Sequence, residues 1–386
     1  MKKQLTRIAS WMLLAMMGQA GAFAQDIRID MNQAYPEKTI CLQEVAEVKY
    51  IPLGTTDEAL FNGTLVNLSS QGIAGFNKKE GDILVFDGNG KVISSFNHLG
   101  QGPNEYPQIF HLDVDWKQKE IYVQDNLRKK IRIYALDGNY LRTIQAKGTM
   151  RQEDMFHFSN THLIYSMKPE KKQFAPYQPV TLISKKDGSA ISLPFTKKEE
   201  TDIKATGGPF GNMKLTAKLV NGLYKKGNEV YVNEVTADII YRVEKNHTLT
   251  PIIQRTPSYE VEQGKDFLLM LRGANKRYYF FKRQQALLEF QGNAATDPKS
   301  TYIAYDRKSK EIVQPTFTNN DYPSQDIPMS KILQCAGDTS QCYLLLEAFK
   351  LKEALEEGKL KGELKSIAEK LDEEDNPVLM VVEFKK

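Results

Sequence analysis

The chain has 386 residues, of which 41% are hydrophobic and 26% are charged, with a formal net charge of +4. Lys2, Lys3 and Arg7 lie in the first 24 positions, which hold no acidic residue, so the remaining chain carries a charge of +1. That near-neutral chain has no basic run interleaved with aromatic residues, which argues against nucleic acid as a partner.

Residues 1–24 have the features of a secretory signal. A basic start precedes the short apolar core Trp11–Met17, and Ala22-Phe23-Ala24 matches a small-x-small cleavage pattern, so we expect the mature protein to begin at Gln25. The core is shorter than the roughly 20 apolar residues of a spanning helix, and no later segment is long and apolar enough to span. No Cys follows the core to carry a lipid anchor. These features predict an exported protein, either periplasmic or secreted.

One segment contains a complete set of four strands. Between Gly100 and Ile144, short runs rich in Ile, Val and Tyr are separated by polar links, and the last link, Asp137-Gly138-Asn139, is typical of a tight hairpin. Four antiparallel strands joined by hairpins form one blade of a β-propeller. The four runs are Ile109–Asp115, Glu120–Asp125, Lys130–Ala135 and Tyr140–Gln145.

The strand–turn–strand pattern of the second half of this blade recurs along the chain. The first three copies start at residues 83, 131 and 180, and later intervals are longer, which indicates loop insertions. A period near 50 residues is typical of a four-stranded blade. The five copies are Ile83–Phe96, Ile131–Ile144, Val180–Leu193, Ile239–Ile253 and Tyr302–Phe317.

The first two strands of the other blades are also predicted from apolar runs. They are Thr64–Ser69 and Gly72–Asn77 in blade 1, Met155–Ser159 and His162–Ser166 in blade 3, Leu219–Lys225 and Glu229–Glu234 in blade 4, Lys276–Phe281 and Gln285–Gln291 in blade 5, and Lys331–Cys335 and Cys342–Glu347 in blade 6.

The end of the chain predicts how the ring closes. Ala348–Leu371 is rich in Leu, Glu, Lys and Ala without Pro and predicts a helical insertion, and Val378–Phe384 predicts a final strand. Blade 6 then lacks one strand, while Val45–Leu53 precedes blade 1 without a partner. We expect this segment to complete blade 6, because an open ring would expose unpaired edges. The sequence therefore predicts an all-β, six-bladed propeller as a single domain over 25–386, with a helical insertion at 348–371.

The whole chain after the leader resembles a family of exported bacterial six-bladed β-propellers of unknown function, related in fold to NHL-repeat and TolB-like propellers. The resemblance rests on Val48–Phe61, Leu84–Lys91, Gly100–Tyr106 and Asp372–Lys385. It implies the propeller fold and export. Many members of the family look like lipoproteins, whereas this chain lacks the Cys for lipid attachment, and the resemblance implies no catalytic residue.

Two acidic motifs have alternative interpretations. Asp87-Gly88-Asn89-Gly90 resembles the start of a calcium loop but lacks the Glu that should follow, so a hairpin turn is the simpler interpretation. Asp113 and Asp115 alternate on one strand and share a face, which suits either a divalent cation or the polar edge of a strand at the channel.

The histidines and the known nucleotide and nucleophile motifs provide no catalytic signature. His111 and His157 occupy similar places in blades 2 and 3 and can face the channel, but no H-x-H or HExxH spacing supports zinc, and a hydrogen-bonded structural role is the alternative. G-x-S-x-G, P-loop and G-x-G-x-x-G motifs are absent. We therefore expect no cofactor, with a divalent cation as the alternative.

Cys335 and Cys342 lie at facing ends of two predicted strands across a six-residue loop. Cysteines opposed across a hairpin can bridge if the register permits, and export permits oxidation. The alternative is a pair of half-buried thiols, and Cys41 would remain unpaired.

The connection Gln101-Gly102-Pro103-Asn104-Glu105-Tyr106 joins one blade to the next. As a binding site, it would offer Gln101, the Glu105 carboxylate and the Tyr106 ring, and His111 and Asp113 are further candidate ligand-binding residues that can face the channel. As a structural clamp, Glu105 would accept backbone N–H bonds and Tyr106 would wedge between blades.

Two functions remain open. The first is a non-catalytic, monomeric propeller that binds an envelope ligand, protein or glycan. The second is a metal-dependent hydrolase or lyase at the channel mouth, which would require three or more acidic or His side chains to converge there.

Overall fold

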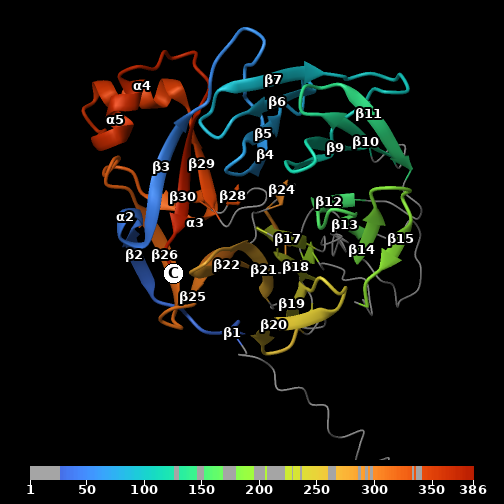
Figure 1. Cartoon of the computed structure of the whole chain (residues 1–386). Coiled ribbons are helices and arrows are strands. Elements are labelled where there is room, and N and C mark those ends of the chain that lie inside the picture. The colour runs from blue at the N-terminus through green and yellow to red at the C-terminus, as the bar shows by residue number, and fades with distance from the viewer. Residues whose placement is uncertain are drawn as a thin grey trace, which may run out of the picture.

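Six four-stranded antiparallel sheets stand around a central axis in the computed structural model, which confirms the six-bladed β-propeller (Figure 1). The structure describes residues 27–125, 130–145, 152–167, 180–194, 205–206, 222–227, 229–234, 237–259, 267–285, 288–291, 294–295, 299–332, 334–335 and 341–386. The expected signal sequence lies outside these residues. No helix in the described ranges is long and apolar enough to cross a membrane.

The strands of each blade are ordered from the innermost, beside the channel, to the outermost. Blade 1 contains β4 (Thr64–Leu68), β5 (Ile73–Phe76), β6 (Asp82–Phe86) and β7 (Val92–Asn97). Blade 2 contains β8 (His111–Asp115), β9 (Glu120–Asp125), β10 (Lys130–Ala135) and β11 (Tyr140–Gln145). Blade 3 contains β12 (Gln152–His157), β13 (His162–Met167), β14 (Val180–Ser184) and β15 (Ala190–Ser192). Blade 4 contains β17 (Gly222–Lys226), β18 (Glu229–Asn233), β19 (Ile239–Val243) and β20 (Leu249–Thr256). Blade 5 contains β21 (Phe267–Ala274), β22 (Tyr278–Gln285), β25 (Ser300–Asp306) and β26 (Ile312–Thr318). Blade 6 contains β28 (Gln334–Cys335), β29 (Cys342–Leu346), β30 (Val378–Phe384) and β3 (Ala46–Pro52).

The core is divided among the junctions between blades. Because successive side chains of a strand point to opposite faces, each blade sends alternate residues toward its two neighbours. In blade 2, Leu112 and Val123 pack with blade 1, whereas Tyr122 packs with blade 3. Each of the six junctions holds such a buried cluster, so every blade is stabilised by contacts on both sides.

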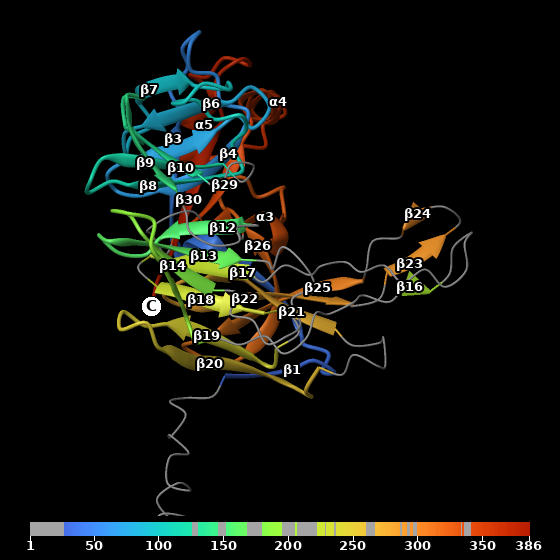
Figure 2. The ribbon, with the colours of Figure 1, turned by 90° about the vertical axis from the view of Figure 1, so that its right-hand side faces the viewer.

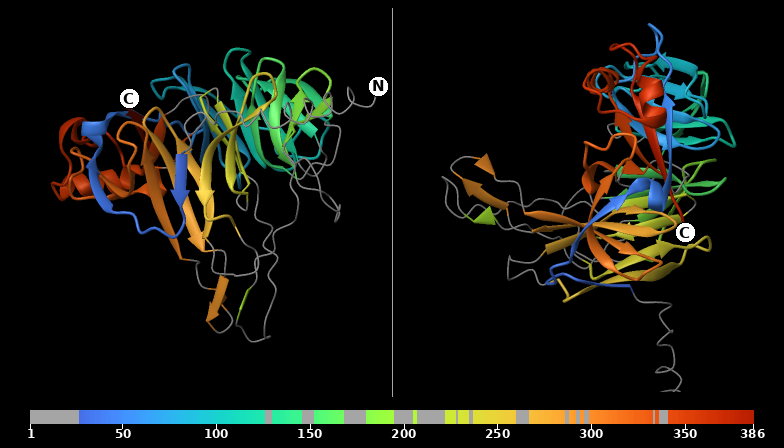
Figure 3. Two further views of the ribbon diagram at one scale, coloured as in Figure 1. Left: turned by 90° about the horizontal axis from the view of Figure 1, so that it is seen from below. Right: turned by 90° about the vertical axis from the view of Figure 1, so that its left-hand side faces the viewer.

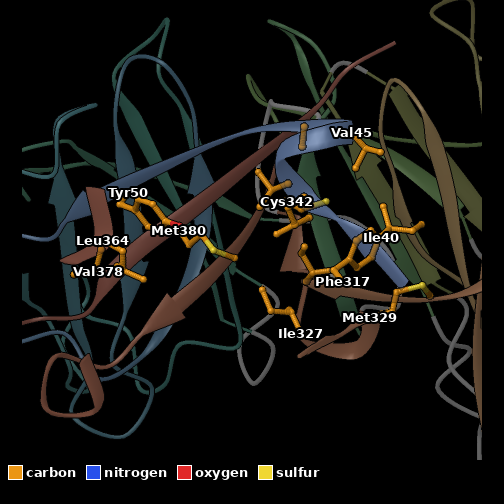
Figure 4. Close-up of a cluster of buried hydrophobic side chains, with 14 of the residues drawn as sticks. Ile40, Val45, Tyr50, Phe317, Ile327, Met329, Cys342, Leu364, Val378 and Met380 are labelled. Atoms are coloured by element: carbon orange, nitrogen blue, oxygen red, sulfur yellow. The ribbon is translucent and has the colours of Figure 1, made fainter. Parts of the chain in front are cut away.

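The two ends of the chain meet in blade 6, as predicted. β3 pairs antiparallel with β30 over its full length, from Ala46 opposite Phe384 to Pro52 opposite Val378. Tyr50 and Met380 lie in one buried cluster with Phe317 of blade 5 (Figure 4). The predicted helical insertion forms two helices, α4 (Ala348–Glu356) and α5 (Gly362–Ala368), between β29 and β30.

Two further N-terminal strands were not predicted. β1 (Ile27–Asp30) pairs in parallel with β20 at the outer edge of blade 4, and β2 (Glu37–Cys41) pairs in parallel with β26 at the outer edge of blade 5. The short helix α2 (Leu42–Val45) then leads into β3. β1 and β2 therefore cover the outer edges of blades 4 and 5, which would otherwise be free to pair with another chain.

The strand assignment in blade 5 was wrong by one strand. The apolar runs predicted the first two strands at Lys276–Phe281 and Gln285–Gln291, whereas they are β21 and β22. The missed signal is Asn275, whose side-chain Oδ1 accepts the backbone N–H groups of Arg277 and Tyr278 at 2.9 and 2.8 Å and makes a tight turn there. The apolar run that follows this turn is consequently β22, the second strand of blade 5.

A small three-stranded sheet projects from one side of the ring (Figures 2 and 3). It contains β16 (Ala205–Thr206), β23 (Leu288–Gln291) and β24 (Ala294–Ala295), and β16 pairs in parallel with β23. The C terminus lies on the opposite side of the ring (Figure 2). The remaining elements, β27 (Ile327–Pro328) and the short helix α3 (Met329–Ile332), link blades 5 and 6.

Candidate functional site

The connection between β7 and β8 is folded back upon itself. The Gly102 N–H donates to Glu105 Oε2 at 2.7 Å, and the Gly100 N–H donates to the Tyr106 carbonyl at 3.0 Å. A Cβ on Gly100 would lie 2.0 Å from the Glu105 carboxylate, so a larger residue at this position would displace that carboxylate. Gln101 is exposed at this surface. The Glu105 carboxylate is thus already used within the connection.

Tyr106 is fully buried between blades 1 and 2. Its hydroxyl accepts the His98 N–H at 2.9 Å and donates to the Gly81 carbonyl at 2.8 Å, and its ring meets that of Tyr134 edge-on with centroids 5.9 Å apart. Burial raises the pKa of Tyr106 well above its ordinary value. These contacts describe the wedge that the clamp interpretation requires and leave the ring no surface for stacking on a ligand.

Asp113 joins four of the innermost strands around the channel. Its carboxylate accepts from Asn67 Nδ2 of β4 at 2.8 Å and from the His157 N–H of β12 at 2.5 Å, and lies 3.7 Å from Lys225 Nζ of β17. Burial by itself raises the pKa of Asp113, but the Lys225 charge and these hydrogen bonds outweigh it, so the pKa lies below its ordinary value.

Asp115 lies two residues further along β8 and contacts a second lysine. Lys185 Nζ donates to Asp115 Oδ2 at 2.8 Å and lies 2.7 Å from His157 Nδ1, which is itself 3.2 Å from Asp115 Oδ2. Burial alone raises the pKa of Asp115, but the hydrogen bonds from His157 and Lys185 lower it well below its ordinary value. The two carboxylates are therefore matched by two ammonium groups.

His111 shares the face of Asp113 and is half-buried, with its ring edge-on to Phe156 at 5.7 Å between centroids. Burial lowers the pKa of His111, which keeps the ring neutral at pH 7 despite the opposing effect of Asp113. Asp113, Asp115, His111 and His157 do converge at the channel, but lysines contact both carboxylates. No group of three or more His, Cys, Asp or Glu in the described ranges has an arrangement that could hold a metal ion.

Asp87-Gly88-Asn89-Gly90 forms the hairpin turn between β6 and β7. Asp87 Oδ1 accepts the N–H groups of Asn89 and Lys91 at 2.8 and 2.9 Å, and Gly90 has a φ of +86°. The Asp87 carboxylate therefore serves the turn itself.

The register of blade 6 brings the two cysteines of the predicted bridge together. Cys335 of β28 lies directly opposite Cys342 of β29. Opposed residues of an antiparallel pair have Cα atoms about 4.5–5.5 Å apart, which is within the range of a disulfide. Cys41 lies elsewhere, with its thiol near Gln43 and Asn320.

We expect Cys335 and Cys342 to be joined in the exported protein. Titration of the denatured, unreduced chain should find one thiol, that of Cys41, whereas reduction should release all three. The matched variant Cys41→Ser should contain no thiol before reduction. Three titratable thiols in freshly exported, unreduced protein would rule out the bridge.

A cavity of about 720 Å³ lies between blades 4 and 5. Blade 4 contributes residues of β17, β19 and β20 together with Ile27 of the adjoining β1, and blade 5 contributes β22, β25 and the turns that precede and follow this pair. Eight of the lining residues are basic, and no acidic residue is among the described residues that line it: Lys226, Arg242, Lys276, Arg277, Arg307, Lys308, Lys310 and Lys386.

The sequence did not predict this cavity, for a physical reason. Five of the basic residues lie in hairpin turns and two lie at the end of a strand or of the chain, where a charged side chain normally contacts only solvent, whereas Arg242 lies within β19. Arg307-Lys308-Ser309-Lys310 is the one local signal, because three basic residues share a single turn. Only the packing of two blades brings this turn to face Lys226 and Arg242, which lie more than 60 residues earlier.

The closed ring of six four-stranded sheets defines the protein as a six-bladed β-propeller. The model of a family described as a domain of unknown function, DUF4934, matches residues 26–383. The chain therefore belongs to this family. No match was found among curated proteins.

Solved structures of similar fold include an exported protein and a member of another uncharacterised family. A protein of Bacteroides fragilis described as exported superposes with a TM-score of 0.63 and 16% identity, covering 94% of this chain and 100% of that one. A DUF4221 member from Bacteroides vulgatus has a TM-score of 0.49 and 12% identity, covering 89% and 99%. Virginiamycin B lyase from Staphylococcus aureus has a TM-score of 0.36 and 11% identity over 77% and 81%, too distant to support an inference about activity.

Proposed function

We propose that this protein is an exported, non-catalytic, monomeric propeller that binds a ligand or partner in the cell envelope. Export is supported by the leader-like residues 1–24 and by the exported description of the Bacteroides fragilis protein of the same fold. The proposal covers both the periplasm and the cell exterior.

The observation that favours binding over catalysis is the pairing of charges in the channel. Lys225 contacts Asp113, and Lys185 contacts Asp115, and all four side chains are buried. A buried carboxylate that is neutralised by an ammonium group and hydrogen-bonded on both oxygens is a poor general base and a poor metal ligand. Such a network instead stabilises the inner strands of four blades, which leaves the surface cavities for recognition.

A specific observation supports the second candidate, a metal-dependent hydrolase or lyase. His111, Asp113, Asp115 and His157 lie on two neighbouring inner strands, and movement of the two lysines would free an oxygen and nitrogen ligand set. His111 and His157 are half-buried, whereas the two carboxylates are buried.

A ligand panel separates the two functions. The mature chain is mixed with oligosaccharides, peptides and polyanions, and binding is detected as a shift of the thermal unfolding transition. Each compound is then recovered, and its mass is measured by mass spectrometry. We expect at least one class to raise the melting temperature and to be recovered intact, with the same result in EDTA. A product whose formation stops in EDTA and in His111→Gln would favour the enzyme, and binding of no class would contradict the proposal.

A further inference from the structure

The cavity between blades 4 and 5 opens on the side of the ring where the chain ends, since Lys386 itself lines it. This is the side opposite the projecting sheet of β16, β23 and β24 (Figure 2). Its volume of about 720 Å³ lies within the roughly 300–1,000 Å³ that is usual for ligand pockets. Neither the connection at Gly100–Tyr106 nor the Asp113 network contributes to it.

The charges of this cavity are only partly compensated. Four of its eight basic residues pair with carboxylates that lie outside the lining, and the other four, Arg307, Lys308, Lys310 and Lys386, make no ion pair within the described part of the chain. The four pairs are Lys226 with Glu229 at 2.9 Å, Arg242 with Glu244 at 2.8 Å, Lys276 with Glu383 at 2.6 Å and Arg277 with Asp306 at 3.0 Å. Like charges that converge on one space repel each other, and an anion in that space would relieve the repulsion.

Two arginines of the blade 5 wall are held in place. The Arg307 guanidinium lies 5.2 Å from the centre of the Tyr279 ring, and its Nη1 donates to the Asn275 carbonyl at 3.2 Å. Arg277 is anchored by Asp306 on one side. Guanidinium groups that are already oriented lose little entropy when they bind an oxyanion, and they match phosphate and sulfate geometry with two parallel hydrogen bonds.

The cavity also has apolar walls. Ile27 and Ile252 line it from the blade 4 side, and the largely buried rings of Tyr279 and Tyr305 line it from blade 5. The Thr250 side chain adds a hydroxyl. Basic groups on both walls, with apolar surface between them, suit a ligand that carries separated anionic groups on a backbone, rather than a single small ion.

The comparable junction of blades 1 and 2 is filled. There the turn between the third and fourth strands contains Gly138, where a Cβ would lie 2.6 Å from the Phe96 ring of β7, and Ser94 of β7 hydrogen-bonds to the Leu136 carbonyl. At blades 4 and 5, the corresponding turn carries Arg307, Lys308 and Lys310 and faces the open cavity. The space is therefore not a general consequence of how blades pack.

We propose that this cavity binds a polyanion with at least two phosphate or sulfate groups, one near the Lys226 and Arg242 wall and one near the Arg307–Lys310 turn. The proposal rests on the binding function above and names the class of ligand. It requires no catalytic group and no metal ion.

The test uses two probes, sodium tripolyphosphate and a heparin-derived sulfated hexasaccharide, titrated calorimetrically into the mature protein at low salt. We expect one or both to bind, with an affinity that falls as salt rises, because screening weakens attraction between exposed charges. Lys308→Glu with Lys310→Glu should raise Kd by about tenfold or more, which corresponds to about 1.4 kcal/mol. Binding of tripolyphosphate alone assigns a phosphate ligand, and binding of the hexasaccharide alone assigns a sulfated glycan.

The matched control is Lys117→Glu with Lys119→Glu in the turn between β8 and β9. Both turns are exposed, and Lys119 and Lys310 share a left-handed backbone, with φ of 56° and 66°. The control changes the net charge equally and should leave Kd within about twofold. Failure of both probes to bind, or equal weakening in the two double variants, would overturn the polyanion proposal. If a neutral compound of the panel still binds, the broader binding function survives that failure.

Discussion

Removal of residues 378–386 should prevent the ring from forming. β30 lies between β29 and β3, so its loss leaves edges unpaired on both sides of blade 6. Six of its seven side chains are buried, and each contributes about 1.5–3 kcal/mol by burial. Together they are comparable to the roughly 5–15 kcal/mol by which a typical domain is stable. We therefore expect an unfolded or aggregated product, and no cooperative melting.

The control for this truncation is a chain that ends at Lys385, which keeps β30 and the hydrogen bond from the Lys385 N–H to the Val45 carbonyl at 2.9 Å. It should melt like the full chain. Size-exclusion chromatography and circular dichroism report both outcomes. If the truncated protein stayed monomeric and melted at the temperature of the full chain, closure by β3 and β30 would not be what holds the ring.

The second large effect is expected at Tyr106. Tyr106→Ala should lower the free energy of unfolding by about 3–5 kcal/mol, because it removes a fully buried ring between blades 1 and 2. Tyr106→Phe keeps the ring but leaves the His98 N–H and the Gly81 carbonyl without their partner, and should cost about 1–3 kcal/mol. Glu105→Ala should also cost about 1–3 kcal/mol, since the Gly102 N–H loses its acceptor.

Chemical denaturation of these variants needs no knowledge of a ligand. Gln108→Ala is a suitable control, because Gln108 is exposed in the same connection. The order of destabilisation, with Tyr106→Ala largest and Gln108→Ala near zero, is the signature of a clamp. Wild-type stability in both Tyr106→Ala and Glu105→Ala would contradict the clamp interpretation and make this connection a candidate for ligand binding.

Part of the fold could be predicted from the sequence because it depends on interactions between residues that are close together along the chain. Strand alternation and the turn residues of segments such as Asp87–Gly90 and Asp137–Asn139 predicted the hairpins, and their repetition predicted the propeller. Blade 5 was misassigned because the turn at Asn275 rests on one side-chain hydrogen-bond acceptor rather than on a Gly or Pro. The candidate site residues Glu105, Tyr106 and Asp113 were recognised as unusual, but their partners, such as Gly81 and Lys225, could not be named.

The sequence by itself therefore determined the number of blades, the strand that closes the ring and the helical insertion, since hydrophobic period and turn chemistry act within a few residues. Only the tertiary structure decided that β1 and β2 cover the edges of blades 4 and 5, because a short edge strand has no partner until the distant edge exists. It also decided that the channel acids are matched by lysines and that eight basic residues surround one cavity. The interaction between two charges in salt solution is screened over about 10 Å, so it depends on distance in space. The packing of the blades sets that distance, because it brings together residues that lie far apart along the chain.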